Sequence, residues 1–246
     1  MNQFIEEIIN APLYGESIKD VSIFLNPITN KTILDIGCGD GQLSLFFAMQ
    51  GANIIGIDKR SSALKKATNL LAKYRLDNQT QFIKGLGEQL PLDDSSVDII
   101  YSRSTIQYMN RDKALNEYFR VLKPDGKIAL IENLPHNPII KIFRVIRSIT
   151  SFSIEQKNYI NSINGYITHK EIDDYMSRFE HSTKKEFHLF RMLSIYLSRA
   201  FQTNLAIIKF DNFLKSADRF ILQNVPITKS LAWFCSIYCE KKKQDV

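Results

Sequence analysis

The amino-acid sequence predicts an α/β fold in which helices cover both faces of a mostly parallel sheet. Two short apolar runs of strand type, Thr32–Ile36 and Asn53–Ile57, are separated by a glycine-rich turn and a helical stretch, Gln42–Gln50. A second helical stretch, Ser61–Tyr74, follows the second run and spaces its apolar residues by three or four. Strands that alternate with helices in this way pair in parallel, because each helix returns the chain to the same edge of the sheet.

The alternation continues for the rest of the first half of the chain. Further strand-like runs occur at Thr80–Ile83, Val97–Tyr101 and Lys127–Glu132. A helical stretch, over Tyr118–Leu122 and its neighbours, precedes the last of these runs. We therefore expect the sheet to be built mainly from the residues before 134.

The second half of the chain has a different pattern, dominated by amphipathic helical stretches. The helical stretches are Ile139–Ile149, Thr168–Phe179 and Leu205–Leu222. Two further strand-like runs are Lys185–Leu189 and Ala232–Cys239. Thr168 and Glu171 have the spacing of a capping box, which predicts that a helix begins there. We interpret the chain as one domain over 1–246, with an N-terminal helical segment (1–29), a core (30–133), and lid helices with the last strands (134–246).

The composition is that of an ordinary globular protein. The chain has 246 residues, of which 44% are hydrophobic and 24% charged, and this excludes collagen, coiled coil, disordered chain and disulfide framework. The three cysteines cannot all pair and none has a metal-ligand spacing, so we expect no metal site and a reduced, cytoplasmic compartment. No secretory signal is expected at 1–12, and no apolar run reaches the roughly 18 residues of a membrane-spanning helix.

The positive charge is concentrated in the second half. Residues 1–133 contain 15 lysines and arginines against 16 acidic residues, whereas residues 134–246 contain 17 against 10. A basic second half predicts attraction to an anionic group, which could belong to a phosphate, a lipid surface or a nucleic acid.

The glycine-rich turn after the first strand predicts a cofactor site. Gly37, Gly39 and Gly41 lie where the backbone must turn sharply, and the absence of Cβ atoms lets a ligand approach the backbone closely. Asp58 ends the next strand, where a carboxylate can accept hydrogen bonds from two ribose hydroxyls. A tight structural turn and a helix-capping carboxylate are the alternative interpretations of these residues.

A nicotinamide dinucleotide site fits this turn less well. The fingerprint of such sites is Gly-x-Gly-x-x-Gly, whereas Gln42 lies three residues beyond Gly39. Asp35 also precedes the turn, where it would repel a pyrophosphate and attract an ammonium group. The turn therefore favours a cofactor that carries positive charge.

At these residues the sequence resembles the class I S-adenosylmethionine-dependent methyltransferases, in particular their type 11 small-molecule branch. Leu34–Gly41 matches the first motif of the family, and Asp58 falls at its ribose-binding acid. The segment 87–98, GEQLPLDDSSVD, is similar to the family's A-E-x-L-P-F-x-D-x-S-F-D, and 122–127, LKPDGK, is similar to its L-K-P-G-G turn. The resemblance implies a Rossmann-like sheet of seven strands with an inserted helical lid, and S-adenosylmethionine as cofactor.

The resemblance also implies which residues contact the cofactor. They are Asp35, Gly37, Cys38, Gly39, Asp58, Lys59, Leu86, Gly87, Glu88, Ser102 and Gln107. Two positions depart from the family. Many relatives carry an acid at the position of Leu86, where it accepts a hydrogen bond from the adenine amine, and two histidines at the positions of Gln107 and Tyr108. Acceptor chemistry cannot be transferred from those relatives.

His136, shortly after the fifth strand-like run, is the candidate catalytic residue. A residue there lies at the carboxyl end of the sheet, and an imidazole is suited to proton removal near neutral pH. The alternative is that His136 caps the next helix. We expect His169, His181 and His188 to lie at the surface, and Cys235 and Cys239 to be buried. Tyr14 precedes the first strand in a segment that commonly closes over the cofactor in relatives, so contact with substrate or cofactor is one interpretation of this residue and packing is the other.

The resulting hypothesis is a methyltransferase that acts on a small-molecule, lipid-linked or sugar-linked acceptor, with oxygen favoured as the methylated atom. The alternatives are an RNA or protein methyltransferase and a cofactor-binding scaffold without turnover. Nucleic acid is disfavoured as a partner, because the chain lacks the tetrapeptides N-P-P-Y and D-P-P-Y. A peripheral membrane contact through Leu205–Leu222 is a side hypothesis, and we expect that helix to be buried against the sheet. The sequence predicts neither the acceptor nor the oligomeric state.

Overall fold

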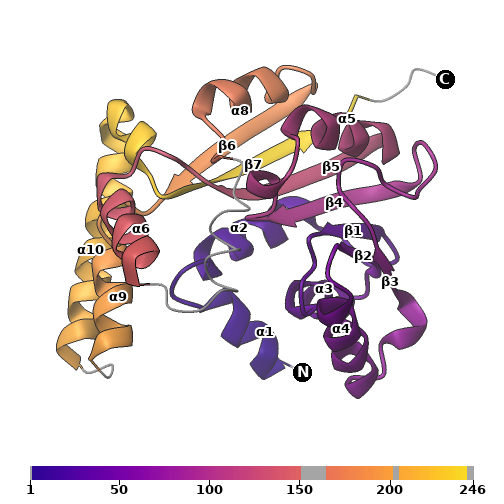
Figure 1. The fold of residues 1–246 in the computed structure, drawn as a ribbon, viewed down its shortest axis with the longest axis horizontal. Helices are drawn as coiled ribbons and strands as arrows, with labels where there is room; N and C mark the ends of the chain where they lie inside the picture. The colour runs from indigo at the N-terminus through magenta and orange to yellow at the C-terminus, as the bar shows by residue number, and fades with distance from the viewer. Residues whose placement is uncertain (1, 151–164, 202–204, 243–246) are drawn as a thin grey trace.

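The computed structural model describes residues 2–150, 165–201 and 205–242, and within them seven strands form one sheet (Figure 1). The strand order is β3-β2-β1-β4-β5-β7-β6. The strands are β1 (Thr32–Ile36), β2 (Asn53–Asp58), β3 (Thr80–Lys84), β4 (Val97–Arg103), β5 (Leu122–Asn133), β6 (His181–Phe187) and β7 (Phe234–Glu240). Strands β1 to β5 pair in parallel, and β7 runs antiparallel to both β5 and β6. The predicted mostly parallel, seven-stranded sheet is confirmed.

Helices cover both faces of the sheet, as predicted. They are α1 (Asn2–Ile9), α2 (Gly15–Leu25), α3 (Gln42–Ala48), α4 (Ser61–Lys73), α5 (Arg111–Val121), α6 (Pro138–Thr150), α8 (His169–Met176), α9 (Met192–Ala200) and α10 (Leu205–Asn224). Short 3-10 turns are η1 (Asp77–Gln79), η2 (Ile106–Tyr108) and η3 (Pro226–Leu231). Buried side chains of α2, α3 and α4 pack on one face, and those of α5 and α8 on the other.

Strand β5 shows how the sequence produces this layered core. Its side chains alternate between the two faces, so Ile128 and Leu130 join the core under α5, whereas Ala129 and Ile131 join the core under α2 and α3. All four are fully buried. Burial on both sides explains why residues 128–131 of this strand form an uninterrupted apolar run rather than an alternating one.

Several element boundaries differ from the prediction. The helix expected over Gln42–Gln50 ends at Ala48, before Gly51, whose φ of 90° requires a left-handed turn. The helical stretch expected around Tyr118–Leu122 is α5, and Leu122 already belongs to β5. The strand expected at Lys185–Leu189 is β6, which begins four residues earlier, at His181. Its first half was not predicted because those exposed residues lack an apolar pattern. The capping box of α8 is confirmed by both hydrogen bonds between Thr168 and Glu171.

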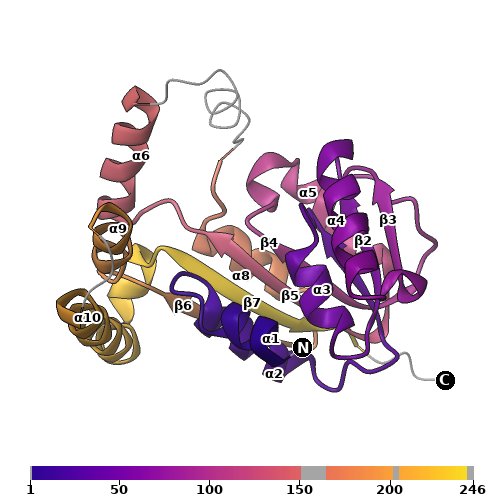
Figure 2. The same ribbon diagram turned by 90° about the horizontal axis from the view of Figure 1, so that it is seen from below.

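Helices α6, α9 and α10 and turn η3, here called the lid helices, lie beyond the carboxyl end of β5 (Figures 1 and 2). Parts of the predicted lid, 151–164 and 202–204, lie outside the described residues, as do 243–246. The rings of Phe143 on α6 and Tyr196 on α9 stack with centroids 3.9 Å apart. No helix in the described ranges is long and apolar enough to cross a membrane.

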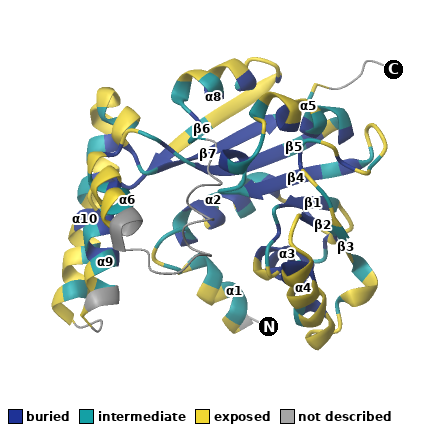
Figure 3. Ribbon diagram, in the orientation of Figure 1, coloured by how far each residue is buried: buried dark blue, intermediate teal, exposed yellow. Residues whose placement is uncertain are grey.

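The expected burial of α10 against the sheet is only partly correct. Among its twenty residues only Leu214, Asp218 and Leu222 are buried, and they recur every four residues on one side of the helix. Much of the remaining surface of α10 is exposed (Figure 3). The exposed part includes large apolar side chains such as Phe213 and Phe220.

Candidate functional site

A cavity of about 420 Å³ opens at the carboxyl ends of β1, β2 and β4. This edge is where ligands bind in open parallel sheets, because loops diverge there from neighbouring strands. The lining residues are Tyr14, Ile36, Gly37, Ile57, Asp58, Lys59, Arg60, Gly85, Leu86, Gly87, Glu88, Arg103, Ser104, Thr105, Tyr108 and Met109. The volume lies within the range of about 300–1,000 Å³ that is typical of small-molecule sites.

The turn after β1 forms one wall of the cavity and is fixed by backbone hydrogen bonds. The amides of Gly37 and Cys38 both donate to the carbonyl of Ile57, at 2.7 and 3.1 Å. Gly37 has a φ of 72°, and a Cβ atom at this position would overlap the side chain of Thr105. Glycine is therefore required at residue 37 both by the left-handed backbone and by the adjacent loop.

Asp58, at the end of β2, presents its carboxylate to the cavity while binding the glycine turn. Its Oδ2 accepts a hydrogen bond from the amide of Gly39 at 3.0 Å, and its Oδ1 accepts from the amide of Arg60 at 2.8 Å. The Arg60 side chain also contacts both oxygens, with Nε 3.2 Å from Oδ1 and Nη2 3.3 Å from Oδ2. The carboxylate thus links the tips of two neighbouring strands.

Asp35 lies beneath the glycine turn and does not line the cavity. It is buried and accepts a hydrogen bond from Ser44 Oγ at 2.5 Å. Burial raises the pKa of this carboxyl group to about 6, against smaller opposing contributions from the Ser44 hydrogen bond and from Arg103. Asp35 therefore supports the turn from below.

The opposite wall is apolar and contains one unsatisfied carboxylate oxygen. Leu86 is 53% exposed at this wall, and a Cβ atom on Gly87 would overlap the sulfur of Met109. Glu88 Oε1 accepts a hydrogen bond from the amide of Asn110 at 3.0 Å. Its Oε2 is buried without a hydrogen-bond partner among the described residues. A buried oxygen of this kind is suited to a donor supplied by a ligand.

The loop after β4 is held by a buried carboxylate on β5. Glu132 Oε1 accepts hydrogen bonds from the amides of Thr105 at 3.1 Å and Ile106 at 3.3 Å. Burial raises the pKa of Glu132 to about 7, and these two hydrogen bonds oppose the shift. Ser104 Oγ, in the same loop, lies 3.2 Å from the hydroxyl of Tyr14. Tyr14 thereby joins the segment before α2 to the cavity.

The structure brings six of the predicted cofactor residues to the cavity, namely Gly37, Asp58, Lys59, Leu86, Gly87 and Glu88. Five others do not line it, namely Asp35, Cys38, Gly39, Ser102 and Gln107. Ser102 is fully buried within β4, because that strand extends to Arg103 rather than ending at Tyr101. Gln107 is buried and accepts a hydrogen bond from Asn133 at 3.2 Å.

Sequence reasoning missed several lining residues. They are Ile36, Ile57, Arg60, Gly85, Arg103, Ser104, Thr105 and Met109, and Tyr108 was noted only as a departure from the family. Arg60 could have been predicted to lie at the site, because it follows the strand-end carboxylate of Asp58 by two residues. Ser104 and Thr105 could have been found only with the correct end of β4.

His136 is exposed and is not among the residues that line the cavity. Helix α6 is capped instead by Asn137, whose Oδ1 accepts a hydrogen bond from the amide of Ile140 at 3.0 Å. The alternative role of His136 as that cap is therefore wrong, whereas its role as a base stays a prediction. Of the other histidines His181 is exposed and His169 is half-buried.

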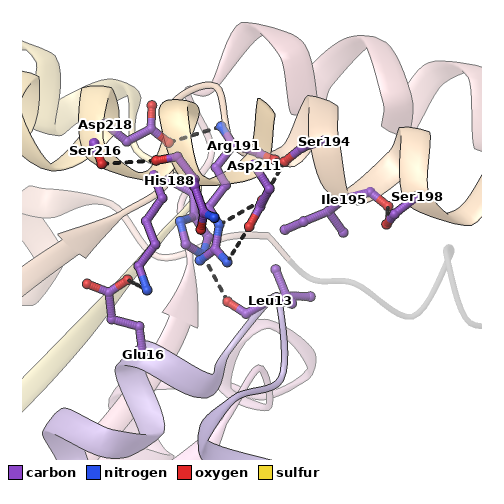
Figure 4. Close-up of polar contacts among 12 residues, drawn as sticks. Leu13, Glu16, His188, Arg191, Ser194, Ile195, Ser198, Asp211, Ser216 and Asp218 are labelled. Carbon is purple, nitrogen blue, oxygen red and sulfur yellow. Dashed lines mark hydrogen bonds and ion pairs between the residues drawn. The ribbon is translucent and has the colours of Figure 1, made fainter. Parts of the chain in front are cut away.

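The expectation that His188 lies at the surface is wrong, since only 4% of this residue is exposed. Its Nε2 lies 2.9 Å from the carbonyl oxygen of Leu13, next to Tyr14 (Figure 4). Burial lowers the pKa of His188 to about 4, so the ring is neutral near pH 7. This burial cannot be predicted from the sequence, because His188 follows a strand whose first half is polar.

Two aspartates of α10 fix the chain beside His188 (Figure 4). Asp218 accepts hydrogen bonds from the amides of Leu189, Phe190 and Arg191, at 2.9 to 3.2 Å. Asp211 binds Arg191 through two contacts of 3.0 Å. A second cavity, of about 310 Å³, opens here. The lysine and arginine side chains that line it each form an ion pair with an aspartate or glutamate.

Comparison with known proteins identifies relatives of the core. Residues 34–130 match the family model described as "Methyltransferase domain". Demethylmenaquinone methyltransferase of Lactobacillus johnsonii is 36% identical over 114 residues, 44% of this chain and 47% of that protein. Sterol 24-C-methyltransferase of Pneumocystis carinii is 37% identical over 107 residues, 42% of this chain and 28% of that protein. The match thus spans less than half the length of each of these curated relatives.

The fold is shared over most of the chain. The structure of geranyl diphosphate C-methyltransferase from Streptomyces coelicolor A3(2) superimposes with a TM-score of 0.64 at 16% identity, covering 93% of this chain and 81% of that one. The residues matched by the family model, 34–130, run from within β1 to within β5, and the cavity opens at the carboxyl ends of β1, β2 and β4. Residues 34–130 thus match the methyltransferase-domain family, and the chain as a whole shares its fold with a solved methyltransferase structure.

Proposed function

We propose that this protein transfers a methyl group from S-adenosylmethionine to a small-molecule acceptor. The observation that carries the proposal is the position of Asp58 and the glycine turn at one wall of a 420 Å³ cavity, with an apolar wall opposite. A nucleoside needs these two surfaces, since its ribose donates hydrogen bonds and its base packs against apolar groups. The family match over 34–130 supports this interpretation.

The residues of the cavity fit the parts of this cofactor. Asp58 would accept hydrogen bonds from the ribose, and Leu86 and Met109 would pack against the adenine. The unpartnered Oε2 of Glu88 would accept a hydrogen bond from the adenine amine, a role that Leu86 cannot fill. Lys59 lies beside the same cavity, and Gly37 and Gly87 leave room for the ligand. The half-buried Gly39 and the buried Asp35, Cys38, Ser102 and Gln107 would support these walls.

In methyl transfer, the main task of the protein would be to align the acceptor with the cofactor. S-adenosylmethionine carries its methyl group on a sulfonium and so supplies an already activated methyl group. The side chains of the cavity would bind and orient the reactants and exclude water. For an oxygen acceptor, His136 would remove the proton, and this role requires it to approach the cavity from its exposed position after β5.

The proposed acceptor is a small molecule with an apolar body or a lipid- or sugar-linked group, methylated at oxygen. Support comes from the names of similar proteins, which act on demethylmenaquinone, a sterol and geranyl diphosphate. Those names include carbon methyltransferases, so the methylated atom must be measured. We place the reaction in the cytoplasm, in keeping with three cysteines that are all free thiols.

The proposal is tested in two steps. Calorimetry with S-adenosylhomocysteine should give a saturable binding isotherm. Mass spectrometry should then compare extracts of cells with and without the protein, after feeding with methionine labelled in its methyl group. We expect label in one small-molecule or lipid species only when the protein is present. Label in RNA or protein would contradict the acceptor class, and binding without any labelled product would identify a scaffold without turnover.

A further inference from the structure

The lid helices expose apolar side chains that the rest of the described chain does not cover. On α6, Ile142, Val145 and Ile146 are 49–60% exposed, and their spacing of three and four places them on one side of the helix. The side of α6 opposite this stripe carries the buried Ile140, and Phe143, next to the stripe, stacks on Tyr196 of α9. The exposed stripe is therefore a fixed outward surface of α6.

Helix α10 carries exposed apolar side chains of its own. Phe213 and Phe220 are each 66% exposed and lie seven residues apart, which is two helical turns. Leu214, Asp218 and Leu222 hold the other side of the helix against the protein. We define the lid face as the exposed apolar side chains of α6 and α10, namely Ile142, Val145, Ile146, Leu205, Ile208, Phe213 and Phe220.

The charges beside the lid face have one sign. Lys141 and Lys209 are exposed, lie four residues before Val145 and Phe213, and make no ion pair with any described residue. The lid helices contain only two acidic residues, Asp211 and Asp218. Asp218 is buried on backbone amides, and Asp211 is bound by Arg191 and Ser194. Neither carboxylate is left to balance the two lysines.

We propose that the lid face docks onto the surface of an anionic phospholipid bilayer. Apolar side chains enter the headgroup boundary, while lysines at their edge stay with the phosphates. A second copy of the chain fits less well, because a symmetric contact would bring lysine against lysine without an acid between them. The lid follows β5, so docking would hold the carboxyl edge of the sheet, where the cavity opens, near the lipid.

Vesicle sedimentation tests the proposal without cofactor or acceptor, so its failure is separate from failure of the methyltransferase proposal. The full-length protein is mixed with vesicles of phosphatidylglycerol and phosphatidylcholine in equal parts, or of phosphatidylcholine alone. We expect sedimentation with the anionic vesicles at low salt and much weaker sedimentation with neutral vesicles or at high salt. Absence of sedimentation at low salt would overturn the proposal.

Two pairs of variants locate the contact. Replacing the lid-face residues in Ile142→Glu with Phe213→Glu should abolish sedimentation, whereas Ile23→Glu, at an equally exposed isoleucine on α2, should leave it unchanged. Lys141→Gln with Lys209→Gln should weaken vesicle binding roughly 30-fold, because each basic side chain near an anionic surface strengthens binding about fivefold. The matched control is Lys65→Gln with Lys66→Gln, on exposed positions of α4.

Sedimentation that survives both lid variants would overturn the proposal by assigning binding to another surface. A dimer in sedimentation velocity that Ile142→Glu with Phe213→Glu dissociates would also overturn it, because the lid face would then be occupied by a second copy. Lys141→Gln with Lys209→Gln keeps the test valid if the glutamate variants fail to fold, since exposed lysines that form no ion pair are replaceable at little cost in stability.

Discussion

Arg60 is bound to the carboxylate of Asp58, with its Nε 3.2 Å from Oδ1 and its Nη2 3.3 Å from Oδ2. Together with the amides of Gly39 and Arg60, these contacts give the carboxylate four donors. A carboxylate offers about four lone-pair sites, so ribose hydroxyls must displace part of this arrangement. The Arg60 side chain, which is largely exposed, is the group that can leave.

Asp58→Ala should weaken binding of S-adenosylhomocysteine by about 1.5–3 kcal/mol, the range for hydrogen bonds to a charged group. Arg60→Ala should act in the opposite direction and strengthen binding by about threefold, since an exposed ion pair contributes less than about 1 kcal/mol. Calorimetry on both variants checks the pair, with Asp77→Ala on η1 as a surface control. Unchanged affinity of Asp58→Ala would show that the ribose assignment is wrong.

Glu88→Ala should weaken binding of S-adenosylhomocysteine roughly tenfold, because the buried Oε2 would no longer receive the adenine amine. The sharper comparison uses the inosine analogue, in which an oxygen replaces that amine. The wild-type protein should discriminate against the analogue, and Glu88→Ala should bind both ligands about equally. If the variant discriminates as strongly as the wild-type protein, another group recognises the amine.

Gly37→Ala and Gly87→Ala should differ in their effects on stability. At residue 37 the new methyl group would meet the branched side chain of Thr105, in a left-handed backbone, so we expect a loss of about 2–4 kcal/mol in the free energy of unfolding. At residue 87 its closest contact would be the end of the flexible Met109 side chain, with Ile36 Cγ2 farther away at 3.3 Å, and the loss should stay below about 1 kcal/mol. Urea denaturation measures both, and equal losses would contradict this account.

The sequence predicted the fold well because most of its strands are buried on both faces and read as plain apolar runs. Thr32–Ile36 was predicted with its observed bounds, since a glycine turn ends it sharply. Strand β6 was misplaced, because its exposed residues His181–Thr183 carry no apolar signal. Strand ends that lack a glycine or proline, such as that of β4, cannot be located by periodicity alone.

The candidate site was predictable where a motif fixes the residue and not where tertiary structure does. Asp58 and Gly37 were found from their places at strand ends, and both line the cavity. Thr105 and Met109 reach it through a loop whose position depends on Glu132, a contact between residues far apart in the chain. The burial of His188 likewise depends on Leu13, which the sequence cannot place beside it.

His136→Ala should lower the rate of methyl transfer by about 10²–10⁴-fold and leave the affinity for S-adenosylhomocysteine unchanged, if His136 is the general base. The measurement uses the labelled acceptor fraction identified in extracts, with calorimetry on the same preparation. His181→Ala, at an exposed histidine on β6, is the matched control. An unaltered rate for His136→Ala would remove His136 from the catalytic residues.

His188 should make the protein less stable in mild acid. Burial holds the pKa of its ring at about 4 in the folded state, against an ordinary value of about 6.5 in the unfolded chain. The unfolded chain therefore binds more protons between these values, so stability is fully present above pH 6.5 and falls as the pH drops toward 4. The loss should amount to about 3 kcal/mol at the low end.

The matching variant is His188→Asn, because His188 has a φ of 62° and asparagine tolerates a left-handed backbone better than most residues. Urea denaturation of both proteins between pH 7.5 and 4 isolates the contribution of the histidine. Asp35 and Glu132, whose raised pKa values favour stability at low pH, contribute equally to both proteins and cancel in the difference. Parallel stability curves would show that the ring of His188 is not held neutral by burial.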